Sequence, residues 1–361
     1  MKGIKNFLWF LYKCFAFCTL LIYILIFWIP FDGWLAGFVM MSFPVLILVH
    51  LISVPIWFLI DRKRALLPVV VLAFGCLFLP RTYKFGDDVE PDRGNPGTFS
   101  VMGYNTHTFM RNLDVRDAAV KKEIGDMKSW LAGSGADILC MPEYFEDRSK
   151  LFNLAETLEK AGYLYSNRFN YPDGAANNYY SGLILFSKHP IVHARDTIFE
   201  SQNGMVQADI KIGSDTVRVV AVHLYSMTLN LSKLAHQKQI DGIKQESKIT
   251  FRRMKDGFKQ RSKEIKILKT WTKDSPYPVI VCGDFNEVPY GYVYGELGRD
   301  MKNSFEEKGD GFGFTFNHLP YFIRIDHQFY SSDKLDLLDF KTRSDIKFSD
   351  HYPIMGTYQF R

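Results

Sequence analysis

Two side chains that can take part in acid–base or metal chemistry follow a short apolar run in residues 279–286. Residues 279–282 are apolar and predict a fully buried strand, and Gly283 ends the run and allows the backbone to turn. Asp284 and Asn286 stand two residues apart, so an extended backbone places a carboxylate and a carboxamide on one side of the strand end. This stretch alone leaves two interpretations open. One is a turn rich in Asx residues, and the other is a catalytic carboxylate beside an amide that stabilises an oxyanion.

Polar side chains of similar types recur at the ends of other apolar, strand-like runs. In chain order they are Asn105, Glu143, His223, Asp284, Asn286, Asp326, Asp350 and His351. Any one of them has an ordinary structural explanation, but the whole set predicts one site at one edge of a sheet structure. Carboxylates with few histidines and no cysteines favour Mg²⁺, or Mn²⁺, over zinc. A histidine beside carboxylates can orient or neutralise a phosphoryl oxygen, so the chemistry fits metal-dependent hydrolysis.

The elements that must position these residues alternate between buried strands and helices, as in a soluble α/β protein. Strands are predicted at 98–104, 136–141, 182–186, 217–222, 279–282, 314–316 and 323–330, and loops at 164–181 and 289–298. Residues 232–270 predict a helix with twelve Lys or Arg against four Asp or Glu. That helix is either a solvated crossover helix or a patch for phosphates and anionic headgroups.

The composition differs sharply between the two ends of the 361-residue chain. Residues 1–80 are nearly all apolar, whereas 81–361 have the composition of a soluble domain. The formal net charge of +5 is small for this length and does not identify an acidic partner. The five cysteines show neither a disulfide framework nor a zinc-ligand spacing.

The apolar region predicts two or three transmembrane helices, at about 8–30, 34–60 and 65–80. The third run is short and contains Pro68 and Gly75, so it is the least certain to cross. A cleaved signal peptide is the alternative for the first run, but further apolar runs follow it and no small-residue cleavage site does.

Basic residues predict the orientation of these helices. Lys2, Lys5 and residues 62–64 are basic, and the connection at 31–33 has no Lys or Arg, so the N-terminus and 62–64 are expected on the cytoplasmic side. Three spans place the catalytic domain outside, and two spans place it in the cytoplasm. We favour three, and hence an integral protein of a bacterial cytoplasmic membrane with an extracytoplasmic domain at 98–361. Residues 81–97, rich in Pro, Gly and Asp, predict a linker.

Seven short stretches, taken in order, resemble the endonuclease/exonuclease/phosphatase family, which includes DNase I-like nucleases, inositol polyphosphate 5-phosphatases and bacterial sphingomyelinases. They are residues 104–105, 137–143, 182–190, 222–224, 283–286 (Gly-Asp-Phe-Asn), 324–327 and 349–351 (Ser-Asp-His). Each is weak alone, but together they follow the family order over about residues 98–360. The resemblance implies an α/β fold of the DNase I-like kind. This is a four-layer sandwich of two mainly antiparallel sheets flanked by helices, here preceded by the transmembrane helices.

The resemblance also implies a role for each site residue. Glu143 resembles the principal metal ligand, with Asn105 beside it, and Asp350 is a further candidate ligand. Asp284 resembles the group that orients or deprotonates the attacking water, and Asn286 an oxyanion donor that contacts substrate. His351 resembles the histidine that binds the scissile phosphate, and Asp326 the carboxylate that fixes its tautomer. His223 resembles a second substrate-binding histidine, although its usual carboxylate partner is not evident, and His327 has no assigned role.

The expected activity is in-line attack by water on a phosphorus ester, with Mg²⁺ or Mn²⁺ as cofactor and no covalent intermediate. The substrate class stays open among nucleic acids, sugar or inositol phosphates, and phospholipid or sphingomyelin headgroups. A catalytically dead membrane scaffold is the rival class, but none of the key residues is lost. The calcineurin-like phosphoesterases are excluded because their Asp-x-His and Gly-Asn-His motifs do not occur. The bilayer and the substrate are the expected partners, and no obligate protein partner is evident.

Overall fold

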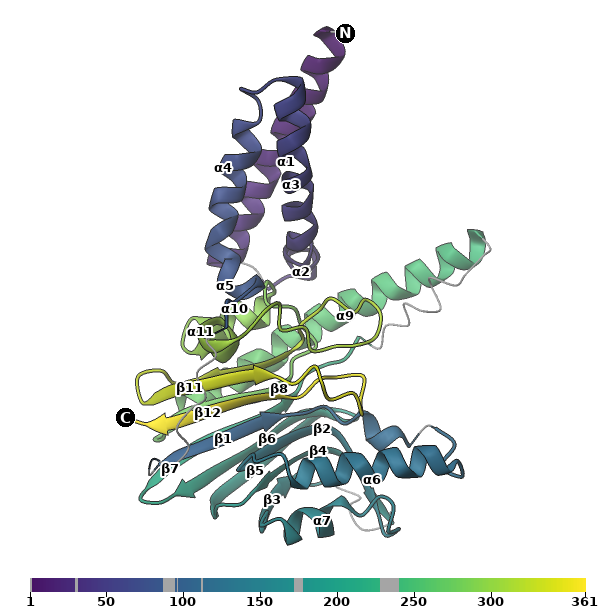
Figure 1. Cartoon of the computed structure of the whole chain (residues 1–361), viewed down its shortest axis with the longest axis vertical. Helices are drawn as coiled ribbons and strands as arrows, with labels where there is room; N and C mark the ends of the chain where they lie inside the picture. Colours follow the sequence, from purple (N-terminus) through teal and green to yellow (C-terminus); the bar gives the residue numbers. More distant parts are fainter. Residues whose placement is uncertain are drawn as a thin grey trace.

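The computed structural model describes residues 2–29, 32–86, 95, 97–111, 113–171, 178–227 and 240–361. Two six-stranded sheets lie face to face in these residues. Helices cover the outer faces of the sheets, and a bundle of N-terminal helices projects from one end of the molecule (Figure 1).

The first sheet has the strand order β11-β12-β1-β2-β4-β3. Its strands are β1 (Thr98–Gly103), β2 (Ile138–Asp147), β3 (Tyr165–Arg168), β4 (Tyr179–Ser187), β11 (Leu335–Thr342) and β12 (Ile354–Phe360). All neighbours are antiparallel except β1 and β2, which run parallel.

The second sheet has the order β5-β6-β7-β8-β10-β9. Its strands are β5 (Ile191–Glu200), β6 (Asn203–Ile212), β7 (Asp215–His223), β8 (Val279–Asp284), β9 (Lys302–Asn303) and β10 (Asp326–Tyr330). Here β7 and β8 form the single parallel pair. Each sheet therefore has a parallel pair near its centre whose carboxyl ends reach the same edge.

The helices of this domain pack on the outer faces of both sheets. They are η2 (His107–Met110), α6 (Ala118–Ala132), α7 (Leu154–Lys160), α9 (Ile240–Lys273), α10 (Tyr292–Gly298) and α11 (Ser304–Lys308). In α6, Ile124, Met127 and Leu131 recur at helical spacing and are buried in the main core. In α9, Ile265 and Leu268 pack against the outer face of the second sheet. The two sheets and two helical layers confirm the expected four-layer α/β sandwich.

The N-terminal helices form a bundle outside this sandwich. They are α1 (Lys2–Trp28), α2 (Trp34–Met41), α3 (Phe43–Ile60), α4 (Leu66–Gly75), η1 (Cys76–Phe78) and α5 (Leu79–Thr82). Two segments, Lys2–Trp28 and Trp34–Ile60, are long and apolar enough to cross a membrane, whereas Leu66–Thr82 is shorter. The chain runs toward the sheets in α1, away from them in α3 and back in α4, so the N-terminus lies far from the sheets (Figure 1).

A buried histidine links two helices of this bundle. His50 Nδ1 lies 2.6 Å from the Tyr12 hydroxyl, and His50 Nε2 lies 3.0 Å from Thr19 Oγ1. Both ring nitrogens therefore have hydrogen-bond partners on α1. Polar contacts of this kind hold apolar helices together where little water is present.

The bundle is fixed to the sandwich at the loop that follows β8. The Tyr290 ring lies 4.5 Å from the Phe43 ring, and the Tyr290 hydroxyl lies 2.8 Å from Thr82 Oγ1. The Arg299 guanidinium donates to the main-chain carbonyl of Trp28 at 2.6 Å. The end of the bundle thus contacts the segment that directly follows Asp284 and Asn286.

Several sequence-based expectations need correction. The loop expected at 289–298 contains α10, because Val293, Tyr294 and Leu297 are buried against the second sheet and this packing overrides the weak helix propensity of the Gly and Tyr residues in the segment. The strand expected at 314–316 is reduced to isolated bridges of Phe316. The loop expected at 164–181 contains β3 and the start of β4.

Other expected boundaries also differ. The strand expected at 136–141 continues to Asp147, and the third apolar helix continues past residue 80 to Thr82. Most of the expected linker, 87–94 and 96, lies outside the described residues. So do 172–177, 228–239 and residue 30.

Candidate active site

Four of the eight predicted site residues lie on the two parallel strand pairs or directly after them, whereas Asn286 follows β8, Asp326 begins β10, and Asp350 and His351 precede β12. Asn105 follows β1, and Glu143 lies in β2 beside it. His223 ends β7, and Asp284 ends the neighbouring β8 at the same register. Because parallel strands end at the same edge, each sheet contributes an adjacent pair of polar side chains.

Asn105 joins the two sheets at this edge. Its fully buried amide nitrogen donates to Glu143 Oε1 and to Asp284 Oδ2, both at 3.1 Å. Its amide oxygen accepts from the main-chain N–H of His107 at 3.0 Å. One carboxamide therefore holds two carboxylates, one from each sheet, at a common point.

Glu143 sits in an irregularity of β2. The register with β4 shifts between Met141 and Tyr144, so Glu143 and the preceding Pro142 bulge out of the ladder. The φ of Glu143 is 50°, in the left-handed region that non-glycine residues seldom adopt. Such a conformation costs about 1–3 kcal/mol and is concentrated at functional sites. The bulge turns this partly exposed carboxylate toward the site.

The Asp284 carboxylate depends on the glycine before it. Gly283 has a φ of 144°, and a Cβ there would lie 2.2 Å from the carbonyl oxygen of Val222, so only glycine fits. Asp284 Oδ1 accepts from the Asn286 main-chain N–H at 2.8 Å. The Asn286 carboxamide donates to the Leu224 carbonyl at 3.0 Å, and its φ is 51°. The carboxylate and the carboxamide are thus held by backbone contacts on both sides.

His351 and Asp326 form a buried pair beside Asp284. His351 Nδ1 lies 2.8 Å from Asp326 Oδ2, and His351 Nε2 lies 3.8 Å from Asp284 Oδ2. Burial opposes the positive charge, but the Asp326 and Asp284 carboxylates outweigh it and raise the pKa of His351 to about 10. Burial, and then the Asp326 charge, raises the pKa of the Asp284 carboxyl. The main-chain N–H of Asp326 donates to Thr315 Oγ1, a residue that the sequence did not single out.

His223 lies on the other side of the two carboxylates. Its Nε2 is buried without a hydrogen-bond partner, 3.8 Å from both Glu143 Oε1 and Asp284 Oδ2. Its Nδ1 lies 3.1 Å from the Gln202 main-chain carbonyl. The sequence showed no carboxylate partner for His223. In the structure the Gln202 main-chain carbonyl is the partner of its Nδ1. A carbonyl only accepts a hydrogen bond, so it favours the tautomer in which Nδ1 carries the hydrogen and donates.

Asp350 reaches the cluster through a histidine that sequence reasoning missed. His107 Nδ1 lies 3.1 Å from Asp350 Oδ2 and 4.0 Å from Glu143 Oε2. The hydrogen bond to Asp350 is the main cause that raises the pKa of His107. Burial opposes ionisation of Asp350, but the His107 hydrogen bond and the charges of the nearby histidines together outweigh it and lower the pKa of that carboxyl.

The position of His107 depends on an unusual turn. All four residues of η2, 107–110, have φ between 44° and 57°. The only sequence signal for this histidine is its place two residues after Asn105, because a left-handed turn of non-glycine residues has no propensity signature.

His327 lies outside the cluster. Its Nε2 contacts the Glu287 main-chain carbonyl at 2.8 Å, and its ring packs against Phe285 and Tyr294. Burial lowers the pKa of His327 to about 3. This environment gives it a structural role beneath the loop that carries Asn286.

The donor set suits a hard divalent cation. Glu143 and Asp284 supply carboxylate oxygens that meet at one point, next to the unpartnered His223 Nε2. Ligand atoms of Asp284, Asp326 and His351 also lie within 4.8 Å of one another. However, His351 and Asp326 already pair with each other, whereas Glu143 is partly exposed, so we favour Glu143 as the ligand. The oxygen of Asn105 faces His107, so in this arrangement Asn105 orients the carboxylates.

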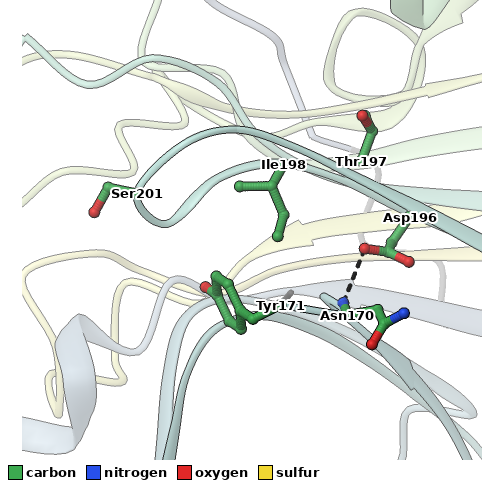
Figure 2. A pocket seen from close by; sticks show the side chains of 6 residues that line it. All are labelled: Asn170, Tyr171, Asp196, Thr197, Ile198 and Ser201. Carbon is green, nitrogen blue, oxygen red and sulfur yellow. Dashed lines mark hydrogen bonds between the residues drawn. The ribbon is translucent and has the colours of Figure 1, made fainter. Parts of the chain in front are cut away.

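A hollow lies beside the cluster, between the β5–β6 hairpin and the segment after β3. Figure 2 shows its lining residues, Asn170, Tyr171, Asp196, Thr197, Ile198 and Ser201. The Asn170 main-chain N–H donates to Asp196 across it. An adjoining hollow of about 720 Å³ shares Asn170, Tyr171 and Ser201 and reaches Gln202. Since Gln202 contacts His223, this hollow borders the site, but none of the predicted site residues lines it.

The sequence of this domain matches the profile of a known protein family. The sequence profile described as Endonuclease/Exonuclease/phosphatase family matches residues 102–351, more than half of the chain and all eight predicted site residues. The chain belongs to this family. Members of the family hydrolyse phosphoester bonds. A second profile, described as Domain of unknown function (DUF8431), matches residues 5–82. A comparison with curated proteins finds no match.

Solved structures show the same fold. An endonuclease/exonuclease/phosphatase from Bacteroides vulgatus is 12% identical, with a TM-score of 0.51 over 73% of this chain and 99% of its own. Sphingomyelinase C from Streptomyces griseocarneus is 16% identical, with a TM-score of 0.50 over 72% of this chain and 99% of its own. At these identities the likeness concerns the fold.

The predicted residues form one connected cluster within the family fold. Six of them, Asn105, Glu143, His223, Asp284, Asp326 and His351, are linked through direct contacts of 3.8 Å or less. Asn286 joins through its main-chain N–H, and Asp350 through His107. Sequence reasoning missed His107, Thr315 and Gln202. It included Ser349 in a motif but gave it no role, and in the structure its hydroxyl donates to the Asn105 carbonyl at 2.8 Å.

The His351–Asp326 pair predicts a defined pH dependence of stability. A group whose pKa rises on folding stabilises the folded state below its unfolded pKa and loses that contribution as the pH approaches its folded pKa. For His351 this window runs from its ordinary value of 6.5 to about 10. We expect His351→Gln to lower the free energy of unfolding more near the lower limit than near the upper one. Unfolding of the full chain in detergent at a series of pH values measures this.

The same substitution in an Asp326→Asn background is the control. Without the carboxylate that raises the pKa of His351, His351→Gln should cost less and the pH trend should flatten. If His351→Gln lowers the free energy of unfolding equally at both pH limits in the chain that retains Asp326, the result contradicts the His351–Asp326 ion pair.

Proposed function

We propose that the chain is a membrane-anchored, divalent-metal-dependent hydrolase that cleaves a phosphoric ester, preferably a phosphodiester, by in-line attack of water. The bridge from Asn105 to both Glu143 and Asp284 is the observation that carries this proposal. It brings the most exposed carboxylate of the cluster and a buried one to the same point. The nearby His351 supplies positive charge for a phosphoryl oxygen.

Each residue has a definite part in the proposed reaction. Glu143, with support from Asn105 and Asp350, would hold Mg²⁺ or Mn²⁺, and the bound ion would supply Lewis-acid stabilisation of charge on the phosphoryl oxygens. Asp284 orients the attacking water and accepts its proton, which its raised pKa favours. The second N–H of the Asn286 carboxamide is available as an oxyanion donor.

The two histidines contact the substrate in this proposal. The His351 imidazolium binds the scissile phosphate, and Asp326 keeps its ring in register through Nδ1. The proposal gives His223 a second phosphate contact through Nε2, the atom without a protein partner, which donates to the phosphate when both ring nitrogens carry a hydrogen. A catalytically dead scaffold is disfavoured because all these groups are present and connected.

Membrane anchoring is supported by the surface of the N-terminal bundle. In the most apolar part of each long segment, only 22% and 17% of the residues are buried. The core helices of a soluble domain are mostly buried. Exposed side chains there include Phe17, Leu48 and Leu59. At the end far from the sheets, Lys5 and Arg64 both pair with Asp61, so the basic residues gather there. This arrangement favours three crossings with the catalytic domain outside the cytoplasm.

The proposed substrate is a phosphodiester at or near the bilayer, because the bundle contacts the loop after Asn286. A phospholipid or sphingomyelin headgroup and a captured nucleic acid both have this chemistry. The nucleic-acid alternative is supported by Arg111, whose guanidinium lies over the Phe145 and Tyr179 rings at 4.7 and 5.4 Å. Such platforms can stack bases.

Substitutions of the two bridged carboxylates test the activity. Glu143→Gln and Asp284→Asn should each lower hydrolysis of phosphodiesters by about 100-fold or more, because each removes a charge required in the transition state. The full chain is assayed in detergent with Mg²⁺ against phospholipid, single-stranded DNA and sugar phosphates. EDTA should abolish the activity.

The matched controls are Glu159→Gln and Asp215→Asn, which change exposed carboxylates away from the cluster. They should retain wild-type activity, and all four variants should unfold cooperatively. Activity that survives in both site variants, or that EDTA leaves unchanged, contradicts the assignment.

Reporter fusions test the orientation. Alkaline phosphatase fused after Gly86 should be active in bacteria, and a fluorescent protein that folds only in the cytoplasm should be dark there, because three crossings place this point outside. Fusions after Lys63 are the control and should give the opposite pattern. If the fusion after Gly86 gives the cytoplasmic pattern, as the one after Lys63 does, Leu66–Thr82 does not cross and the catalytic domain lies in the cytoplasm.

A further inference from the structure

The helix α9 has a continuous stripe of basic side chains. The helix contains eleven Lys or Arg against four Asp or Glu. Seven of the basic residues recur at spacings of three or four: Lys244, Lys248, Arg252, Lys255, Lys259, Lys263 and Lys266. At this spacing the side chains lie along one face of a helix.

This stripe lies beside the end of the N-terminal bundle. Lys255 Nζ lies 4.7 Å above the Trp34 ring, and Lys266 Nζ lies 2.8 Å from Asp32 Oδ2. Lys266 contacts the connection between α1 and α2, and Lys255 contacts the first residue of α2. The apolar segments end here, on the side of the sheets. The stripe is therefore at the level where the headgroups of a bilayer around the bundle would begin.

An apolar stripe runs next to the basic one and continues beyond α2. The Phe38 ring of α2 stacks on Phe251 at 4.9 Å and contacts Phe258 at 5.3 Å. Phe258 is buried, but Phe251 is 48% exposed and Ile243, two turns earlier on the same side, is 40% exposed. The N-terminal half of α9 extends past the sheets and rises beside α2 (Figure 1).

We propose that the N-terminal half of α9, residues 241–256, lies in the headgroup layer of the membrane that holds the bundle, with anionic lipid headgroups bound along its basic stripe. This inference rests on the membrane anchoring proposed above. A helix with apolar side chains beside a Lys/Arg-rich face is the form that binds anionic bilayer surfaces. A helix face that is merely solvated would explain the lysines but not the exposed Phe251 in line with the α2 contact.

The other half of α9 connects this contact to the active site. The Arg261 guanidinium donates to Glu287 Oε2 at 2.9 Å, and Glu287 directly follows Asn286. Glu264 Oε2 accepts from the main-chain N–H of Tyr225 at 2.9 Å, two residues after His223. One helix therefore spans from the proposed lipid contact to both strand ends of the second sheet. Lipid binding along α9 fixes the distance and tilt of the site relative to the bilayer.

Hydrogen exchange of the full chain in nanodiscs tests this proposal. One set of discs contains only phosphatidylcholine, and the other contains about one-third phosphatidylglycerol. Amides of 241–256 should exchange about tenfold more slowly in the anionic discs. The variant Lys248→Glu/Lys259→Glu should lose that difference. The control Lys121→Glu/Lys150→Glu makes the same change of charge near α6 and α7, away from the bundle, and should keep it.

Each other outcome overturns the proposal in a distinguishable way. Equal exchange in both discs, while the chain stays in the membrane fraction after alkaline extraction, rejects the lipid contact and leaves the anchoring intact. A chain released by alkaline extraction rejects both. Protection of 241–256 that requires added single-stranded DNA, and not anionic lipid, would assign the stripe to nucleic acid.

Discussion

The two hydrogen bonds of the Asn105 amide are the contact on which the site depends. They join the Glu143 carboxylate of one sheet to the Asp284 carboxylate of the other. Without this donor, two carboxylates would face each other in a largely buried space. Their repulsion would separate the sheet edges, or it would raise the pKa of one carboxyl so that this carboxyl takes up a proton. The bulge at Glu143 and the closely packed Gly283 before Asp284 both help to bring the two carboxylates to this donor. The fold concentrates the negative charge of two carboxylates there. The amide stabilises this charge by hydrogen bonds, and a hard cation would neutralise it.

The same edge of the sandwich carries the contacts with the N-terminal bundle. Tyr290 packs on Phe43 only four residues after Asn286, and Arg299 bonds the end of α1. Helix α9 adds a second connection through Arg261 and Glu287. The apolar helices are thus packed against the loop of the active site and are more than a tether. The full chain is accordingly the appropriate form for functional work, because a fragment that begins after the bundle exposes the Tyr290 surface.

The sequence predicted the fold class and the proximity of the eight side chains, for reasons that individual residues make clear. Buried strands ending in Asn105, His223 and Asp284 have a strong apolar signature, and the order of motifs supplied the sheet arrangement. It did not predict His107, because the left-handed η2 turn that positions it arises from tertiary contacts. It missed the Gln202 carbonyl because a main-chain group has no sequence signal. It predicted a loop where packing of Tyr294 creates α10.

Binding of Mn²⁺ to the full chain in detergent tests the central claim most directly, since it requires no knowledge of the substrate. Electron paramagnetic resonance of free Mn²⁺ should show saturable uptake by the wild-type protein. Glu143→Gln should weaken that binding by about 100-fold, because a neutral amide replaces the charged ligand and also disturbs the Asn105 bridge. Glu159→Gln should bind as the wild type does. Undiminished Mn²⁺ binding by Glu143→Gln would contradict the claim that Glu143, held by the Asn105 bridge, is the principal ligand of the metal site.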